Sequence, residues 1–359
     1  MSVTVSKPKA RKILREAIDL ARSDSTLPVE WTSHTRAVFE LEEMTWTPAF
    51  ATILLAKSVE ENIDALSLKA KPQTPNPRAY SARGLCHSVI VPAAVEYGFS
   101  IRNTGSEPLN NSPFVSAARI EDIENRAKKR TNFTYFYDVA KRANELPAEE
   151  AFLALAAFLR EALSVAARIN SIIVKTNGLT ASGVRVAVND FLRLDADDRP
   201  RRLQAFAAAC LDLVFDEVKS RRLNDPSRDF PGDVHAVLEE SIGMAVEVRG
   251  KAVSATAAAA FARKCAAAGI DRAVLFVDAA NQEVLDSREI AASSGMENSN
   301  ITIFEDSISI LESALMWTSY EISSAVKILS ERVLRRLREI EVSTQTLQEW
   351  TRAIAVAQG

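Results

Sequence analysis

Two short β-branched segments separated by a polar turn constrain the fold more than any other part of this sequence. They run from Asp233 to Leu238 and from Met244 to Val248, and residues 239–243 between them include two glutamates, a serine and a glycine. Alternating β-branched residues on both sides of such a turn predict an antiparallel hairpin. The fold must therefore contain a sheet, although much of the chain has helical periodicity.

The hairpin brings two acidic side chains together. If the chain reverses at the middle of the turn, Asp233 lies directly opposite Glu247, and opposed side chains have Cβ atoms ~5 Å apart. Two carboxylates this close repel each other unless a hard divalent cation lies between them, and Mg²⁺ suits carboxylate and phosphate oxygens. Arg249 falls on the same face, and Lys251 joins it if Gly250 allows a bulge. The alternative is that these residues are charges on a solvated sheet face.

The residues that follow predict one helix and one further strand. Ser254 is a suitable N-cap, residues 255–268 form an alanine-rich helical segment, and Gly269 ends it. The apolar segment Arg272–Asp278 then predicts a strand. The order hairpin, helix, strand indicates an α/β fold whose sheet is covered on one side by the alanine-rich helix.

These residues resemble the PD-(D/E)xK nucleases, and more narrowly the SacI-type type II restriction endonucleases. The resemblance is carried by four segments: Ser220–Asp233, Val246–Ser254, Tyr80–His87 and Thr104–Phe114. It implies a PD-(D/E)xK core, in which a mixed central sheet is flanked by helices, and Mg²⁺-dependent hydrolysis of DNA. It also implies a homodimer that cuts both strands of double-stranded DNA at a short palindrome, GAGCTC or a related sequence.

By that resemblance, Asp233 and Glu247 bind Mg²⁺, with the backbone carbonyl of Val248 as a third ligand. The chain departs from the broad motif because its proline precedes the aspartate by two residues and because Arg249 takes the lysine position. An arginine does not lose its proton in a protein, so Arg249 can steady the hydroxide or the phosphate but cannot be a general base. That task falls to Lys251 or to the metal, since metal coordination lowers the pKa of bound water.

A helix is expected immediately before the hairpin, over Pro200–Arg222, with Pro226 beyond its end. Its apolar stripe consists of Leu203, Phe206, Cys210, Leu213 and Val214. Glu217 follows Cys210 by seven residues and lies close to this stripe, so it is a further candidate acid of the catalytic site. The alternative is that Glu217 lies at the rim of the stripe and meets water.

Candidate DNA-binding residues lie in two parts of the chain. Asn110 and Asn111 have side chains that can read adenine, and Arg83 and His87 lie on the helix expected before their loop. We expect these four residues to read bases or to position the DNA backbone, and the alternative is an Asx-turn loop beside a satisfied helix. Three arginines close to the proposed catalytic site are further candidates: Arg221, Arg222 and Arg228.

We expect three regions: a mainly helical N-terminal region with the DNA-recognition elements, 1–195, a catalytic core, 196–306, and C-terminal helices, 307–359. Helical periodicity marks Lys9–Arg22, Pro48–Asn62, Ser81–Tyr97 and Glu149–Ile169, and Pro92 is expected to kink or divide the third segment. Near the C-terminus, an apolar stripe forms either intrachain core or a dimer surface: Ala325, Leu329, Val333, Leu334 and Leu337.

The composition, with 47% hydrophobic and 25% charged residues, is that of a globular protein. The net charge of −3 does not indicate DNA binding, but local basic clusters can attract DNA whatever the total charge. The three cysteines form no zinc-binding pattern, so a reducing compartment without disulfides is expected. No signal core or membrane-spanning segment is seen, which predicts a cytoplasmic protein without a membrane partner.

Two other functions remain open at this stage. One is a catalytically silent DNA-binding or assembly protein that keeps the fold, and the other is a structure-specific repair or recombination nuclease. The three functions differ in what they do to DNA when a divalent metal is present.

Overall fold

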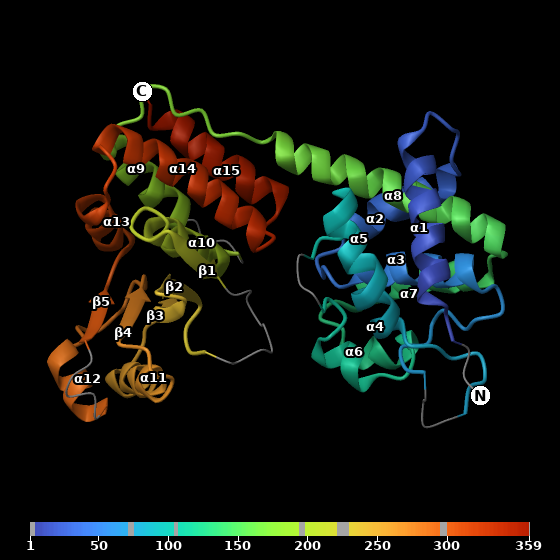
Figure 1. Ribbon diagram of the computed structural model, residues 1–359, viewed down its shortest axis with the longest axis horizontal. Helices are drawn as coiled ribbons and strands as arrows, with labels where there is room; N and C mark the ends of the chain where they lie inside the picture. Colours follow the sequence, from blue (N-terminus) through green and yellow to red (C-terminus); the bar gives the residue numbers. More distant parts are fainter. Residues whose placement is uncertain are drawn as a thin grey trace. The chain divides into compact units, whose positions relative to one another are not determined.

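The computed structural model describes residues 4–70, 75–103, 107–193, 198–220, 230–294 and 300–358. The chain divides into two compact units, Met1–Ser171 and Ile172–Gly359 (Figure 1). The boundary expected at residue 195 therefore falls inside the second unit, after its first helix.

The first unit is built mainly from helices. They are α1 (Lys7–Arg22), α2 (Val29–Glu40), α3 (Trp46–Val59), α4 (Ala82–Leu85), α5 (Val91–Tyr97), α6 (Ser112–Ser116), α7 (Arg130–Glu145) and α8 (Ala148–Ser171). Every residue of α3 is buried, and α1, α7 and α8 pack against it. A helix that is apolar on all sides is expected at the centre of a core, because no face of it is suited to water.

The helix expected over Ser81–Tyr97 is divided, as Pro92 predicts. Between α4 and α5 lies the π-helical segment η1 (Cys86–Ile90), and Pro92 lies in the first turn of α5. Proline has no N–H to donate to the preceding turn, so the regular α-helical hydrogen bonding cannot run through it. Gly98, with a φ of 73°, ends α5 in the left-handed conformation.

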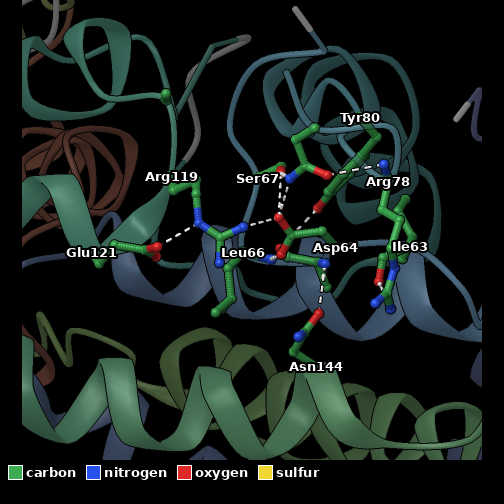
Figure 2. A network of polar contacts seen from close by, with 12 residues as sticks. Ile63, Asp64, Leu66, Ser67, Arg78, Tyr80, Arg119, Glu121 and Asn144 are labelled. Atoms are coloured by element: carbon green, nitrogen blue, oxygen red, sulfur yellow. Dashed lines mark hydrogen bonds and ion pairs between the residues drawn. The ribbon is translucent and has the colours of Figure 1, made fainter. Parts of the chain in front are cut away.

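A polar network holds the connection between α3 and α4 in place (Figure 2). The buried carboxylate of Asp64 accepts hydrogen bonds from Ser67 Oγ at 2.8 Å and Asn76 Nδ2 at 2.6 Å, and forms an ion pair with Arg119. Arg119 precedes the 3₁₀ helix η2 (Ile120–Arg126). A buried carboxylate is tolerated only when it is paired and hydrogen-bonded, so this network ties η2 to the connection.

The second unit contains a five-stranded mixed sheet in the order β1-β2-β3-β4-β5 (Figure 1). The strands are β1 (Glu217–Ser220), β2 (Val234–Leu238), β3 (Ser241–Arg249), β4 (Arg272–Val277) and β5 (Asn300–Phe304). β1, β2 and β3 pair antiparallel, whereas β3, β4 and β5 pair parallel. The expected α/β fold is therefore confirmed.

The helices of this unit are α9 (Ala181–Arg193), α10 (Arg199–Leu211), α11 (Ala255–Ala267), α12 (Ser287–Ser294), α13 (Ser307–Trp317), α14 (Ile322–Glu339) and α15 (Thr344–Val356). Of these, α10, α11, α12 and α13 contact strands of the sheet. α11 begins where predicted, because Ser254 Oγ accepts a hydrogen bond from the N–H of Ala257. Ala245, Ala273 and Leu275 pack against α11 and α12 on one face, and α10 packs on the other (Figure 1).

The long helix expected over Pro200–Arg222 is wrong in its second half. α10 ends at Leu211, and the chain then forms β1 instead of continuing the helix. Val218 is buried in this edge strand, opposite Ala236 of β2. Pairing with β2 therefore outweighs the helical periodicity of the segment, which is a local and weaker preference.

The apolar stripe near the C-terminus belongs to the intrachain core. Its five residues lie on α14, which packs against α10 and α15, and each is at most 4% exposed. The three cysteines are also buried and form no disulfide. Within the part of the chain that the structure describes, no helix combines the length and apolar character needed to span a membrane.

Candidate active site

The antiparallel hairpin expected from the sequence is present, and it brings Asp233 and Glu247 together. Val234 at the start of β2 pairs with Val246 of β3. Asp233 immediately precedes β2, its N–H donates to the carbonyl of Val246 at 2.8 Å, and its carboxylate is close enough to Glu247 to raise the pKa of that residue. The two acidic side chains therefore lie on the same face of the sheet, next to each other.

A two-residue turn and a bulge together produce this register. Glu239 and Glu240 have φ angles of 48° and 65°, which is the left-handed pair that a type I′ hairpin turn requires. The pairing then shifts by one residue after Ala236, where Gly243 is the extra residue of β3. A Cβ on Gly243 would lie 2.5 Å from the Leu238 side chain, so this position requires glycine.

The backbone of Val248 takes part in the same arrangement. Its N–H donates to Asp233 Oδ2 at 2.9 Å. In a strand, the N–H and C=O of one residue point to the same side, so the Val248 carbonyl also faces the side of β3 on which Asp233 lies. The carbonyl of the next residue, Arg249, points to the opposite side of β3, where it accepts a hydrogen bond from the N–H of Asp278 at 2.9 Å. All three expected metal ligands are therefore close together.

The Glu247 side chain is only 16% exposed, so a solvated sheet face does not describe it. Burial raises the pKa of Glu247, and the neighbouring Asp233 carboxylate raises it further. Arg249, which forms an ion pair with Glu247, and Lys264 on α11 lower this pKa. Lys264 was missed by the sequence reasoning, because its proximity depends on how α11 is rotated on the sheet.

A hard divalent cation fits these residues. They offer carboxylate and carbonyl oxygens, the ligands preferred by Mg²⁺, and a cation would relieve the repulsion between Asp233 and Glu247. No group of three or more His, Cys, Asp or Glu side chains suited to a metal occurs among the residues described. The protein ligands of a cation at this hairpin would therefore be two carboxylates and the backbone carbonyl of Val248.

The two candidate cations that follow Glu247 differ in their positions. Arg249 is the last residue of β3 and pairs with Glu247 on the same face, with an exposed side chain. Lys251 lies in the bend after β3, and its side chain is also exposed. Arg249 therefore already contacts the acidic pair, and only the direction of the bend at Gly250 decides where Lys251 points.

The structure does not bring Glu217 to this site. Glu217 lies on edge strand β1, is exposed, and forms an ion pair with Lys219 at 3.0 Å. It lies opposite Val237, whereas Asp233 precedes the other end of β2. The expectation of a helix-borne acid beside the catalytic carboxylates is therefore wrong, because the segment forms a strand.

Two comparisons with known proteins identify the family of this chain. A family model described as the SacI restriction endonuclease N-terminal domain matches residues 9–165. Over 357 residues, the chain is 36% identical to the type II restriction enzyme SacI of Streptomyces achromogenes. The aligned region covers 98% of this chain and 98% of that protein. The chain belongs to the SacI family of type II restriction endonucleases. The family resemblance expected from the sequence is therefore confirmed.

The SacI family model covers the residues expected to contact DNA in the first unit, and three of them lie together. Arg83 Nη1 donates to Asn110 Oδ1 at 3.4 Å, and Asn110 Nδ2 donates to Glu107 Oε2 at 2.6 Å. His87 lies in η1, and its Nε2 is buried without a hydrogen bond. Burial lowers the pKa of His87, and the nearby Glu107 carboxylate only partly opposes this shift. Glu107 was missed by the sequence reasoning, because its position beside Asn110 and His87 depends on how the loop folds against η1.

Asn111 instead has a structural role in this SacI-family chain. Its Oδ1 accepts from the N–H of Phe114 at 3.3 Å, which caps α6, and its Nδ2 donates to Thr45 Oγ1 at 2.8 Å. The Asx-turn alternative therefore describes Asn111. Arg221, Arg222 and Arg228 lie outside the described residues.

Proposed function

We propose that this chain is a Mg²⁺-dependent restriction endonuclease that acts as a homodimer on a short palindromic DNA site, GAGCTC or a related sequence. The observation that carries this proposal is the position of Asp233 opposite Glu247, with the Val248 backbone beside them. The relative is named as a type II restriction enzyme, which favours site-specific cleavage of double-stranded DNA. A palindromic site suits a protein dimer, because two-fold symmetry in the DNA then matches two-fold symmetry in the protein.

In this proposal, Asp233, Glu247 and the Val248 carbonyl hold the Mg²⁺ ion. When bound, the ion supplies a water of lowered pKa and a positive charge at the scissile phosphate. Arg249 keeps its charge at all relevant pH values, so it orients the phosphate rather than removing a proton. Lys251 is the candidate general base, and the alternative is that the metal alone generates the nucleophile.

The proposal extends to the rest of the chain. The mixed sheet with helices on both faces supports a PD-(D/E)xK core within residues 196–306, followed by the C-terminal helices 307–359. Recognition is assigned to residues 1–195, and the proximity of Arg83 to Asn110 and to His87 supports a shared role in reading bases. Arg221, Arg222 and Arg228 are proposed contacts to the DNA backbone beside the catalytic site. We also propose a cytoplasmic location for this enzyme.

Digestion of a plasmid of known sequence with and without Mg²⁺ tests this function. Discrete fragments that require Mg²⁺, and whose sequenced ends map to one palindrome, are expected. Smeared products or a preference for DNA junctions would favour a repair nuclease, and intact but bound DNA would favour a catalytically silent protein.

Three variants assign the reaction to the hairpin. Asp233→Ala and Glu247→Ala should abolish cleavage while DNA binding survives, because each removes one proposed metal ligand. Glu217→Ala is the matched control, since it removes an acidic side chain from the same sheet, and it should cleave like the wild type. Cleavage retained by either hairpin variant would contradict the assignment.

A further inference from the structure

Arg199, the first residue of α10, joins three separate segments of the second unit. Its Nε donates to the carbonyl of Leu192 on α9 at 2.7 Å. Its Nη1 donates to the carbonyl of Asp278 at 2.9 Å and to that of Gly250 at 3.3 Å, and its Nη2 donates to Asp278 Oδ1 at 2.7 Å. One guanidinium group therefore contacts the end of α9, the bend after β3 and the residue that follows β4.

Asp278 completes this connection from the other side. Its backbone N–H donates to the carbonyl of Arg249 at 2.9 Å, and its Oδ2 accepts a hydrogen bond from Ser307, the first residue of α13. The side chains of Arg199 and Asp278 are mostly buried, at 21% and 23% exposed. The carbonyl of Gly250 is thus held by the guanidinium of Arg199, and that of the preceding Arg249 by the backbone N–H of Asp278, whose side chain the same guanidinium binds.

The bend itself packs closely against the arginine. A Cβ on Gly250 would lie 3.1 Å from Arg199 Nη1 and 3.2 Å from Leu203 Cδ1. Glycine is therefore the residue that allows this approach without displacing the guanidinium. The segment that leaves the sheet at Arg249 is consequently fixed by hydrogen bonds to two of its residues and by contact with α10.

We propose that the ion pair between Arg199 and Asp278 positions the segment Arg249–Lys251 for phosphodiester cleavage. The inference rests on the proposed function, because it makes Arg199 and Asp278 positioning residues that act through Arg249 and Lys251. A guanidinium presents its donors in a fixed planar fork, which a lysine ammonium cannot reproduce. Small displacements of groups near a reacting centre can cost ~10²-fold in rate, so a loosened bend should slow the reaction without preventing DNA binding.

Steady-state cleavage by Arg199→Lys and Asp278→Asn tests the inference at a temperature where both variants are folded, as shown by thermal unfolding. Each should lower kcat at least tenfold while KM changes less than twofold, in line with the rate cost of misplaced groups. The matched control is Arg185→Lys, which alters a second arginine–carboxylate pair, with Glu312, that joins α9 to α13 and does not contact β3. The control should retain the wild-type kcat. Unchanged kcat in both test variants would overturn the inference.

Double-mutant cycles separate positioning from a general structural role. If Asp278 acts through the bend, adding Asp278→Asn to Arg249→Ala or to Lys251→Ala should cost much less than it costs in the wild type. Additive effects in both cycles would overturn the inference. Ser307→Ala removes only one hydrogen bond to Asp278, so it should lower kcat by a smaller factor and leave KM unchanged. This variant tests the inference if the other variants do not fold.

Amide hydrogen exchange gives a readout that does not depend on cleavage. In the absence of DNA, Asp278→Asn should increase exchange at the amide of residue 278, which donates to the Arg249 carbonyl, relative to the amides of β3. Unchanged exchange there would overturn the inference even if the protein proved not to be a nuclease. Loss of cleavage in Asp233→Ala tests the proposed function separately, because the hydrogen bonds that hold the bend come from Arg199 and Asp278.

Discussion

The carboxylate of Asp233 accepts a hydrogen bond from the backbone N–H of Val248 at 2.9 Å. This bond joins the end of one hairpin strand to the other directly beside Glu247. The arrangement keeps one carboxylate oriented toward the opposite strand before any cation binds. Folding of the hairpin therefore already orients one ligand of the proposed metal site.

We predict that Glu247→Gln makes the metal-free protein more stable at neutral pH while it removes cleavage. The pKa of Glu247 is raised above its ordinary value of 4.5 by burial and by Asp233. In the pH range between the unfolded and folded pKa values, the unfolded state binds fewer protons, so stability falls as pH rises through that range. Thermal unfolding in a chelator should show a higher midpoint for the variant at neutral pH than for the wild type, with the difference shrinking under acidic conditions. A lower midpoint for the variant at neutral pH would contradict this account.

Replacement of Lys264 should change how cleavage depends on pH. Lys264 lowers the pKa of Glu247, so Lys264→Met should raise that pKa further and move the acidic limb of the kcat/KM profile to higher pH. Lys264→Arg keeps the charge and is the control, for which the limb should stay close to that of the wild type. A profile that is the same for the methionine variant and the wild type would show that Lys264 has no influence on the centre.

The two adjacent asparagines should behave differently when replaced. Asn111→Ala should lower the free energy of unfolding by about 1 kcal/mol, because it removes the cap of α6, and should leave the preferred DNA site unchanged. Asn110→Ala should instead relax discrimination at one base pair, with a cost of about 1–3 kcal/mol for the correct base. Cleavage of a library of single-base variants of the site would measure the base preference of both variants, and chemical denaturation would measure the free energy of unfolding of Asn111→Ala. Altered preference in Asn111→Ala alone would reverse the assignment.

The buried ion pair between Arg336 and Asp212 should be important for the stability of the second unit. Arg336 Nη2 contacts Asp212 Oδ1 at 2.6 Å and also donates to the carbonyl of Val218 at 2.9 Å. Arg336→Met should cost about 3 kcal/mol, because it leaves buried acceptors without their donor. The neighbouring Arg335 also contacts Asp212 but is 42% exposed, so Arg335→Met should cost less than about 1 kcal/mol. Equal losses in chemical denaturation would show that burial does not decide the difference.

The hairpin could be predicted because its signals are local. Period-two alternation and an intervening turn predict a register with Asp233 opposite Glu247, and the structure pairs Val234 with Val246, as that register requires. The route to it differs from a simple turn, since Glu239 and Glu240 form the turn and the bulge at Gly243 restores the pairing. The structural role of Asn111 was expected only as the alternative to DNA contact, and the helix α6 that it caps was not expected.

Other features depend on contacts between distant parts of the chain. Glu217 lies on a strand because the segment pairs with β2, a partner that helical periodicity does not reveal. Lys264 approaches Glu247 only because α11 packs on the face that carries Ala245. The connection from Arg199 to Asp278 joins residues far apart in the sequence, and neither has a motif that would identify it.

The most direct test of the central claim is anomalous diffraction from crystals of the protein with its DNA site and Mn²⁺ in place of Mg²⁺. We predict an anomalous peak between the carboxylates of Asp233 and Glu247, beside the Val248 carbonyl and a DNA phosphate. A peak at another place, or carboxylates that share no ion while DNA is bound, would contradict the account.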